Sequence, residues 1–241
     1  MQEVNIGKLN KLDYSSNEAY KSLRTNIEFC GKEIKVIGLT SCIPNEGKSS
    51  VSINIARSFA ESGKRVLLID SDMRKSVMVG RYRISSKGLN GLSHLLSGYR
   101  DVEEVMCETN IENFYILLSG PTPPNPSELL GNERFKDFIK TAKEYVDYII
   151  IDCPPLGSVI DAAVISQVCD GMALVLSANE ISYKFAQNVK AQLEKTDCRI
   201  LGVILNKVRM RENGYYYGRY YGKYYGKYYG NYYGNSGKSG K

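Results

Sequence analysis

The stretch IKVIGLTSCIPNEGKSS, residues 34–50, begins with an apolar, β-branched run and ends in a glycine, a lysine and two serines. The run is typical of a buried β-strand, and the segment SSVSINIARSFAESG, residues 49–63, has the periodicity of a helix. Backbone N–H groups at the start of a helix attract anions. The stretch therefore predicts a strand, a phosphate-binding loop and a helix in direct succession.

The loop matches the phosphate-binding pattern GxxxxGK[ST] at Gly47, Lys48 and Ser49, while Cys42 stands at the first glycine position. Lys48 is expected to reach the β- and γ-phosphates of a nucleotide, and the Ser49 hydroxyl to face Mg²⁺. A chance meeting of these residues in a loop is the alternative, and their position between a strand and a helix argues against it. The loop residues expected to contact the nucleotide are Glu46, Gly47, Lys48, Ser49 and Ser50.

Further strands are expected wherever short aliphatic runs recur, and helical periodicity fills most of the intervals between them. These runs lie at 65–72, 114–119, 147–153, 171–177 and 199–206. Near-continuous apolar strands that alternate with helices indicate a parallel sheet covered on both faces. The predicted fold class is α/β, a P-loop NTPase fold with a mostly parallel central sheet.

Three aspartates end two of the predicted strands, Asp70 and Asp72 after the second run and Asp152 after the fourth. Open α/β sheets bind their ligands at the carboxyl ends of the strands. Unpaired carboxylates are costly to desolvate, so a Mg²⁺ between them and a nucleotide explains the cluster. The alternative is that each aspartate caps a turn or a helix.

Composition limits the function classes. The 241 residues carry a net charge of only +6, so charge alone does not indicate a nucleic-acid-binding protein. The chain shows no apolar signal core and no run of about 18 apolar residues. Six cysteines without a CxxC pair favour a reducing cytosol. We expect a cytoplasmic protein whose membrane association, if any, is peripheral.

The chain divides into a folded domain over residues 1–207 and a flexible tail over residues 208–241. Glycine recurs at every fourth residue from Gly214 to Gly234, which opposes helix formation. The tail also holds eleven of the 19 tyrosines: Tyr215, Tyr216, Tyr217, Tyr220, Tyr221, Tyr224, Tyr225, Tyr228, Tyr229, Tyr232 and Tyr233. Taken alone, the tail is equally a set of phosphoacceptors, a stacking platform for nucleic acid, or a low-complexity segment.

The segments GKSS, LLIDSDMRK, GPTPPNPSELL and DYIIIDCPP, in this order, resemble the Walker A, Walker A′, proline-rich and Walker B segments of the bacterial tyrosine kinases. The tyrosine-rich tail resembles theirs as well. These kinases belong to the MinD- and ParA-like P-loop proteins. The resemblance implies an ATP:protein-tyrosine phosphotransferase that uses Mg²⁺, phosphorylates its own tail in trans, and regulates the synthesis and export of capsular or extracellular polysaccharide.

The resemblance also assigns roles within the site. Lys48 and the loop amides would act on the transferring phosphoryl group, and Ser49, Asp72 and Asp152 would hold Mg²⁺. Asp70 is the candidate to accept the tyrosine proton, although the division of roles between Asp70 and Asp72 stays open. Asn206 matches a position that contacts adenine in related ATPases, with a plain strand-end cap as the alternative.

Partners follow from the same resemblance. Glu18, Lys21 and Arg24, on a helix expected over about 15–30, resemble an ExxRxxR subunit-contact motif, so a homo-oligomeric ring such as an octamer is expected. The alternative is a solvated, salt-bridged helix face. The family further implies a transmembrane activator of the polysaccharide co-polymerase type, a cognate tyrosine phosphatase, and a location at the inner face of the plasma membrane.

Two other functions compete with the kinase. One is a ParA- or MinD-like positioning ATPase, and the other is an ATP-regulated nucleic-acid-binding module. Ile43 stands where those ATPases carry an extra lysine, and the tail tyrosines are better explained as phosphoacceptors because a kinase needs their hydroxyls. We therefore expect no nucleic-acid partner.

Overall fold

The structure is a computed structural model that describes residues 1–9, 11–85 and 88–208. Met1–Asn206 form one compact unit. All eleven tail tyrosines lie outside the described residues. Among the residues that are described, no helix is long and apolar enough to cross a membrane.

The described part of the chain forms an eight-stranded sheet in the order β1-β4-β5-β3-β6-β2-β7-β8. Neighbouring strands are parallel except for β4 and β5, which are antiparallel. The strands are β1 (Gln2–Val4), β2 (Val36–Ser41), β3 (Val66–Asp70), β4 (Cys107–Thr109), β5 (Phe114–Leu117), β6 (Tyr148–Asp152), β7 (Gly171–Ser177) and β8 (Ile200–Asn206). The mostly parallel P-loop fold is thus confirmed, and the short strands β1 and β4 are additions to it.

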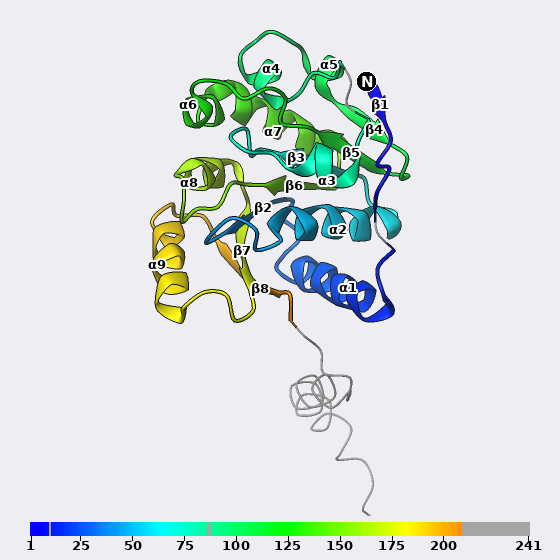
Figure 1. The fold of residues 1–241 in the computed structure, drawn as a ribbon. Coiled ribbons are helices and arrows are strands. Elements are labelled where there is room, and N and C mark those ends of the chain that lie inside the picture. The colour runs from blue at the N-terminus through cyan, green and yellow to red at the C-terminus, as the bar shows by residue number, and fades with distance from the viewer. Residues whose placement is uncertain (10, 86–87, 209–241) are drawn as a thin grey trace, which may run out of the picture. The chain divides into compact units, whose positions relative to one another are not determined.

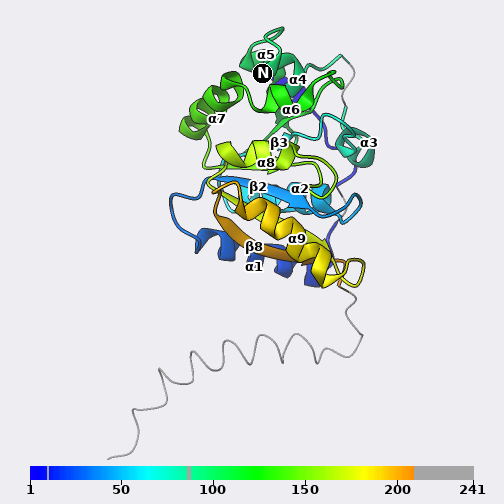
Figure 2. The same cartoon turned by 90° about the vertical axis from the view of Figure 1, so that its left-hand side faces the viewer.

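Helices cover both faces of this sheet, as Figure 1 shows, with α1 and α2 on one side and α6, α8 and α9 on the other. Figure 2 views the second side, with α8 and α9 in front of the strands. The helices are α1 (Tyr14–Glu28), α2 (Lys48–Glu61), α3 (Met78–Tyr82), α4 (Leu92–Leu96), α5 (Val102–Val105), α6 (Pro126–Leu130), α7 (Glu133–Tyr145), α8 (Asp161–Ile165) and α9 (Tyr183–Glu194), with a short 3₁₀ turn at Ser166–Val168.

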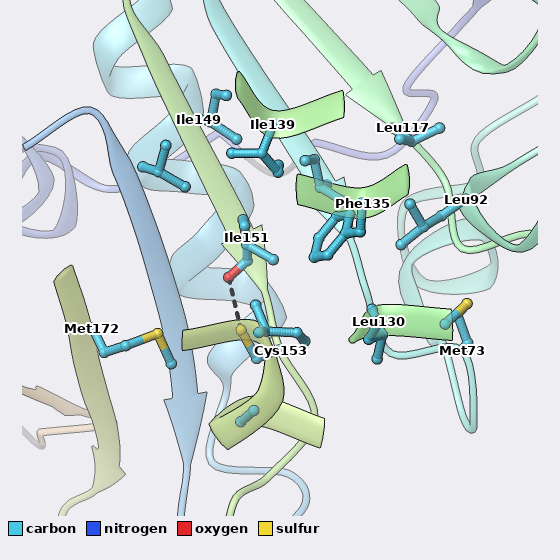
Figure 3. Close-up of a cluster of buried hydrophobic side chains, with 14 of the residues drawn as sticks. Met73, Leu92, Leu117, Leu130, Phe135, Ile139, Ile149, Ile151, Cys153 and Met172 are labelled. Carbon is cyan, nitrogen blue, oxygen red and sulfur yellow. Dashed lines mark hydrogen bonds between the residues drawn. The ribbon is translucent and has the colours of Figure 1, made fainter. Parts of the chain in front are cut away.

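Alternation along the strands divides the core into two layers. On β3, Val66 and Leu68 pack toward α1 and α2, while Leu67 and Ile69 pack toward the helices of the other face. Figure 3 shows the second layer, in which Phe135 of α7 lies beside Ile151 of β6. Successive side chains of a strand point to opposite faces, so buried strands need apolar residues at nearly every position. This explains the continuous apolar runs of the sequence.

Candidate functional site

The loop between β2 and α2 requires glycine at position 47. Gly47 has a φ of 87°, in the left-handed region, and α2 begins at the next residue, Lys48. A Cβ atom at this position would lie 2.1 Å from Nδ2 of Asn206. Both backbone conformation and space therefore restrict the position to glycine.

Glu46 explains how the loop turns without a glycine at Cys42. The Glu46 side chain is fully buried. Its Oε2 accepts hydrogen bonds from the backbone N–H groups of Cys42 at 2.7 Å and Ile43 at 2.9 Å, and its Oε1 accepts one from Ser177 at 2.9 Å. The carboxylate braces the loop against the end of β7, and the predicted contact between Glu46 and the nucleotide stays a prediction. Charge-assisted bonds of this kind are among the stronger ones in proteins.

Asn206 brings the end of β8 to the same loop. Its Nδ2 donates a hydrogen bond to the backbone carbonyl of Glu46 at 2.8 Å. The sequence predicts that Asn206 contacts adenine, with a strand-end cap as the alternative. The structure shows its amide holding the loop, and the contact with adenine stays a prediction. The amide oxygen makes no hydrogen bond to another described residue.

Lys48 lies at the first position of α2 with its ammonium group directed at Asp152. The Lys48 Nζ and Asp152 Oδ1 atoms are 3.3 Å apart, and both side chains are at least nine-tenths buried. Ser52, one helical turn further along α2, donates its hydroxyl to the same oxygen at 3.0 Å. Burial acts to lower the Lys48 pKa, but attraction by Asp152 and Asp72 outweighs it and the pKa is raised. Lys48 is therefore a charged donor beside the phosphate loop.

Asp70 lies next to Asp152, because the two residues are register partners on the parallel strands β3 and β6. Asp70 is almost completely buried and accepts a hydrogen bond from the Ser76 hydroxyl. Burial, with a smaller contribution from the Asp152 charge, raises the pKa of Asp70 to about 7. A carboxyl group with this pKa can exchange a proton near neutral pH.

Asp72 is more exposed than Asp70. Its Oδ1 accepts a hydrogen bond from the backbone N–H of Lys75 at 3.0 Å, and its own N–H donates to Asp70 at 3.3 Å. No three acidic, histidine or cysteine side chains in the described part of the chain form a ready-made metal cage. Mg²⁺ is usually held by one or two carboxylates together with water and substrate phosphates. The donor set of Ser49, Asp72 and Asp152 is of this chemical kind.

The structure separates the three residues expected at a subunit contact. Glu18 and Lys21 form an exposed ion pair on α1, with a distance of 2.8 Å. Arg24 instead donates from Nη1 to the backbone carbonyl of Ser58, on α2 of the same chain, at 2.6 Å. Its guanidinium group thus joins α1 to α2, and Glu18 and Lys21 are the more accessible part of the motif.

Several residues around the site were missed by sequence reasoning. Ser52 was detectable, since a residue four positions after Lys48 lies on the same side of a helix. Ser76 lies only six residues after its partner Asp70. The buried Asp161 carries no local signal, because its partner Arg74 is 87 residues away and becomes a neighbour only when the chain folds. Tertiary contacts thus complete a site of which the sequence shows the main parts.

The chain is similar to known proteins in both its sequence and its structure. Residues 34–197 match the AAA domain family. The tyrosine-protein kinase CpsD of Streptococcus pneumoniae serotype 4 is 47% identical over 207 residues, which cover 85% of this chain and 91% of that protein. The tyrosine-protein kinase YwqD of Bacillus subtilis is 35% identical, with coverage of 83% and 86%.

Solved structures agree with these relatives. The chimerical protein CapA2B2 superimposes with a TM-score of 0.78 at 29% identity, covering 87% of this chain and 95% of that one. The kinase domain of the Escherichia coli tyrosine kinase ETK gives a TM-score of 0.75 at 29% identity, with coverage of 83% and 80%. The phosphate loop, the paired aspartates and these likenesses together show that the chain belongs to the bacterial tyrosine-protein kinases, built on a P-loop nucleotide-binding fold.

Proposed function

We propose that this tyrosine kinase transfers the γ-phosphoryl group of Mg·ATP to the tyrosines of its own tail, Tyr215 to Tyr233, presented by a neighbouring copy. The observation that carries the proposal is the buried pair Asp70 and Asp152 beside Lys48, at the phosphate loop. Phosphoryl transfer requires mainly positioning of the reactants and stabilisation of charge. A cation and two strand-end carboxylates at one helix start are suited to both.

Lys48 and the N–H groups of Gly47, Ser49 and Ser50 would bind the phosphates, as at other helix N-termini. Ser49, Asp72 and Asp152 would hold Mg²⁺ directly or through water, and the ion would neutralise phosphate charge. Binding of phosphates would draw Lys48 away from Asp152 and free that carboxylate. Asn206 and Glu46 would act indirectly, because they hold the loop that contacts the nucleotide.

Asp70 would accept the proton of the attacking tyrosine hydroxyl. A general base works best when its pKa lies near the operating pH, and the pKa of Asp70 is raised to about 7. The Ser76 hydroxyl, which donates to Asp70, would orient the carboxylate. Asp72 lies further into solvent and is better placed for the metal.

The division into a kinase domain over residues 1–207 and a flexible tail over 208–241 belongs to the same proposal. Each phosphotyrosine adds about −1.5 to −2 charges, so modification of most of the eleven tyrosines would add on the order of −15 to −20. This exceeds the net charge of +6 and would make neighbouring tails repel. A ring of subunits in contact through α1 would then disperse.

We place this kinase in the control of capsular or extracellular polysaccharide synthesis, at the inner face of the plasma membrane, with a transmembrane activator and a cognate phosphatase as partners. The likeness to the tyrosine-protein kinase CpsD and to the CapA2B2 chimera supports this placement. The transmembrane activator and the cognate phosphatase are part of this proposal.

The testing experiment is intact mass spectrometry after incubation of phosphatase-treated protein with Mg·ATP. The wild type should gain several phosphates, whereas Lys48→Met and a chain truncated after Asn213 should gain none. Size-exclusion chromatography before and after the reaction tests dispersal of the ring. The assay is repeated with a transmembrane activator of the polysaccharide co-polymerase type. If the chain then hydrolyses ATP without phosphorylating any protein, the result would favour the positioning ATPase instead.

A further inference from the structure

A clamp around one buried carboxylate joins the segments that follow three strands of the sheet. Asp161, the first residue of α8, is fully buried. Its carboxylate accepts hydrogen bonds from Arg74 Nε at 2.7 Å, from Arg74 Nη2 at 3.0 Å and from the Ser127 hydroxyl at 2.6 Å. Arg74 follows β3, and Ser127 belongs to α6. Residues that follow β3, β5 and β6 are thus tied to one carboxylate.

The clamp uses only one edge of the Arg74 guanidinium group. Nε and Nη2 face Asp161, and Nη2 also donates to the Ser127 hydroxyl oxygen at 2.9 Å. Nη1 makes no hydrogen bond to any described residue, and the Arg74 side chain is 40% exposed. A guanidinium group held in this way presents its remaining donors in a fixed direction, so binding an anion there costs little conformational entropy.

The open edge is close to the catalytic aspartates. Arg74 is two residues beyond Asp72 and close enough for their charges to interact. The helices that hold it, α6 and α8, pack on the face of the sheet opposite to α2, which carries Lys48 and Ser49. Arg74 is thus held by elements on the face of the sheet opposite to the helix that carries Lys48 and Ser49, and an anion at its open edge would lie beside Asp72.

We propose that the open Nη1 edge of Arg74 binds the phosphate of the phosphotyrosine product beside Asp72, and that Asp161 and Ser127 are positioning residues for it. This rests on the proposed kinase function. A paired guanidinium and carboxylate carry no net charge, so the product would be recognised by directed hydrogen bonds and still be released. An arginine without such partners could rotate, so it would bind a phosphate approaching from any direction with similar affinity.

Direct binding of two synthetic peptides to the full-length chain tests the proposal without requiring catalysis. The peptides are GYYYGRYYG, the sequence of residues 214–222, and the same peptide phosphorylated on its first tyrosine. With the chain phosphatase-treated and saturated with Mg·ADP, the phosphopeptide should bind the wild type at least tenfold more tightly. Arg74→Ala and Asp161→Asn should abolish this preference, and Ser127→Ala should reduce it.

Controls separate the clamp from general damage and from nucleotide binding. Arg100→Ala, which removes an exposed arginine paired with Glu104 on α5, should keep the wild-type preference. Ser127→Thr keeps the hydroxyl and should therefore retain the preference for the phosphopeptide that Ser127→Ala reduces. The affinity for a non-hydrolysable Mg·ATP analogue should change less than about twofold in Arg74→Ala, since Lys48 and the loop amides, and not Arg74, are proposed to bind the phosphates of ATP.

Two results would overturn the proposal. In the first, the wild type binds both peptides equally, or Arg74→Ala keeps the preference for the phosphopeptide. In the second, Arg74→Ala loses affinity for the ATP analogue and not for the phosphopeptide, which would assign Arg74 to the γ-phosphate. Failure of the kinase function itself would appear separately, as absence of protein phosphorylation in the mass experiment.

Discussion

Asp70 of β3 and Asp152 of β6 are register partners on adjacent parallel strands, so two carboxylates meet in the buried end of the sheet. Lys48 lies within 3.3 Å of Asp152, whereas Asp70 has only the Ser76 hydroxyl as a side-chain hydrogen-bond partner among the described residues. The two acids therefore differ in environment. Asp152 is paired with a cation, and Asp70 holds its proton up to about pH 7.

This difference predicts a stabilising effect of Asp70→Asn at alkaline pH. The folded-state pKa of Asp70 is raised above its ordinary value of 3.8, so its contribution to stability is fully present below that value and is lost as the pH rises through about 7. One pKa unit corresponds to about 1.4 kcal/mol, so the loss is on the order of a few kcal/mol. Asp70→Asn has no carboxyl group to ionise at this position, so it does not undergo this loss of stability.

The measurement is urea unfolding of both proteins without metal or nucleotide, from about pH 4 to about pH 8. The advantage of Asp70→Asn should grow as the pH rises from about 4 to about 7 and then level off, because above its folded-state pKa Asp70 is ionised in both the folded and the unfolded chain. A difference between the two proteins that is the same at every pH would show that Asp70 does not titrate in this range. In the kinase assay the same variant should lose transfer and keep most of its ATP affinity.

Replacing Lys48 by methionine should destabilise the fold as well as abolish transfer. Removal of one partner from a buried ion pair typically costs about 3–5 kcal/mol, because the other charge is left uncompensated. The double variant Lys48→Met, Asp152→Asn removes both charges and should recover part of that loss. Thermal unfolding without ligand checks this, and a double variant no more stable than Lys48→Met alone would contradict it.

Loss of the Glu46 carboxylate should weaken nucleotide binding without removing a nucleotide contact. Glu46→Ala leaves the backbone N–H groups of Cys42, Ile43 and Ser177 without their acceptor, and an unsatisfied buried donor costs about 1–3 kcal/mol. We expect at least a tenfold rise in the Kd for Mg·ATP and a lower Tm. Glu46→Gln keeps one acceptor oxygen, so its Kd and Tm should lie between those of the wild type and of Glu46→Ala.

The matched control is Glu61→Ala, which removes an exposed carboxylate at the other end of α2, paired with Arg57. Exposed substitutions of this kind usually change stability by less than about 0.5 kcal/mol. Calorimetric titration with Mg·ATP gives the affinity. If Glu46→Ala and Glu61→Ala bound Mg·ATP with the same Kd, the hydrogen bonds of the Glu46 carboxylate would not contribute to nucleotide binding.

Gly47→Ala should prevent nucleotide binding through the loop conformation. A left-handed backbone costs a non-glycine residue about 1–2 kcal/mol, and the added methyl group would lie 2.1 Å from Asn206 Nδ2. Asn206→Ala removes the clash but not the backbone strain, and it also removes the hydrogen bond from Nδ2 to the Glu46 carbonyl, so the double variant should recover only part of the affinity. Full recovery would show that the clash alone excludes other residues. Titration with Mg·ATP distinguishes these outcomes.

Much of the fold was predictable because its signals are local. The six aliphatic runs match β2, β3, β5, β6, β7 and β8 to within a few residues. Strands β1 and β4 were not predicted, since each has three residues and lies toward the edge of the sheet. The phosphate loop and the three aspartates were found for the same reason, as each ends or follows a run that is visible in the sequence.

Contacts between distant segments were not predictable in this way. Arg24 has the spacing of an outward-facing motif, yet it donates to Ser58 across the interface of α1 and α2. Glu46 has the position of a nucleotide contact, yet its carboxylate reaches Ser177, 131 residues away in the chain. In both cases the partner is a backbone group, which any residue type can supply, so the sequence holds no sign of the pairing.

Local signals predict the strand, loop and helix of the phosphate site and the carboxylates at the strand ends, because hydrophobic periodicity and glycine conformation act over a few residues. Folding of the whole chain is needed to pair one carboxylate with Lys48, to brace the loop, and to bring Arg74 to Asp161, 87 residues further along the chain. Those contacts depend on the order and register of the strands. Burial in this arrangement raises the pKa of Asp70 to about 7.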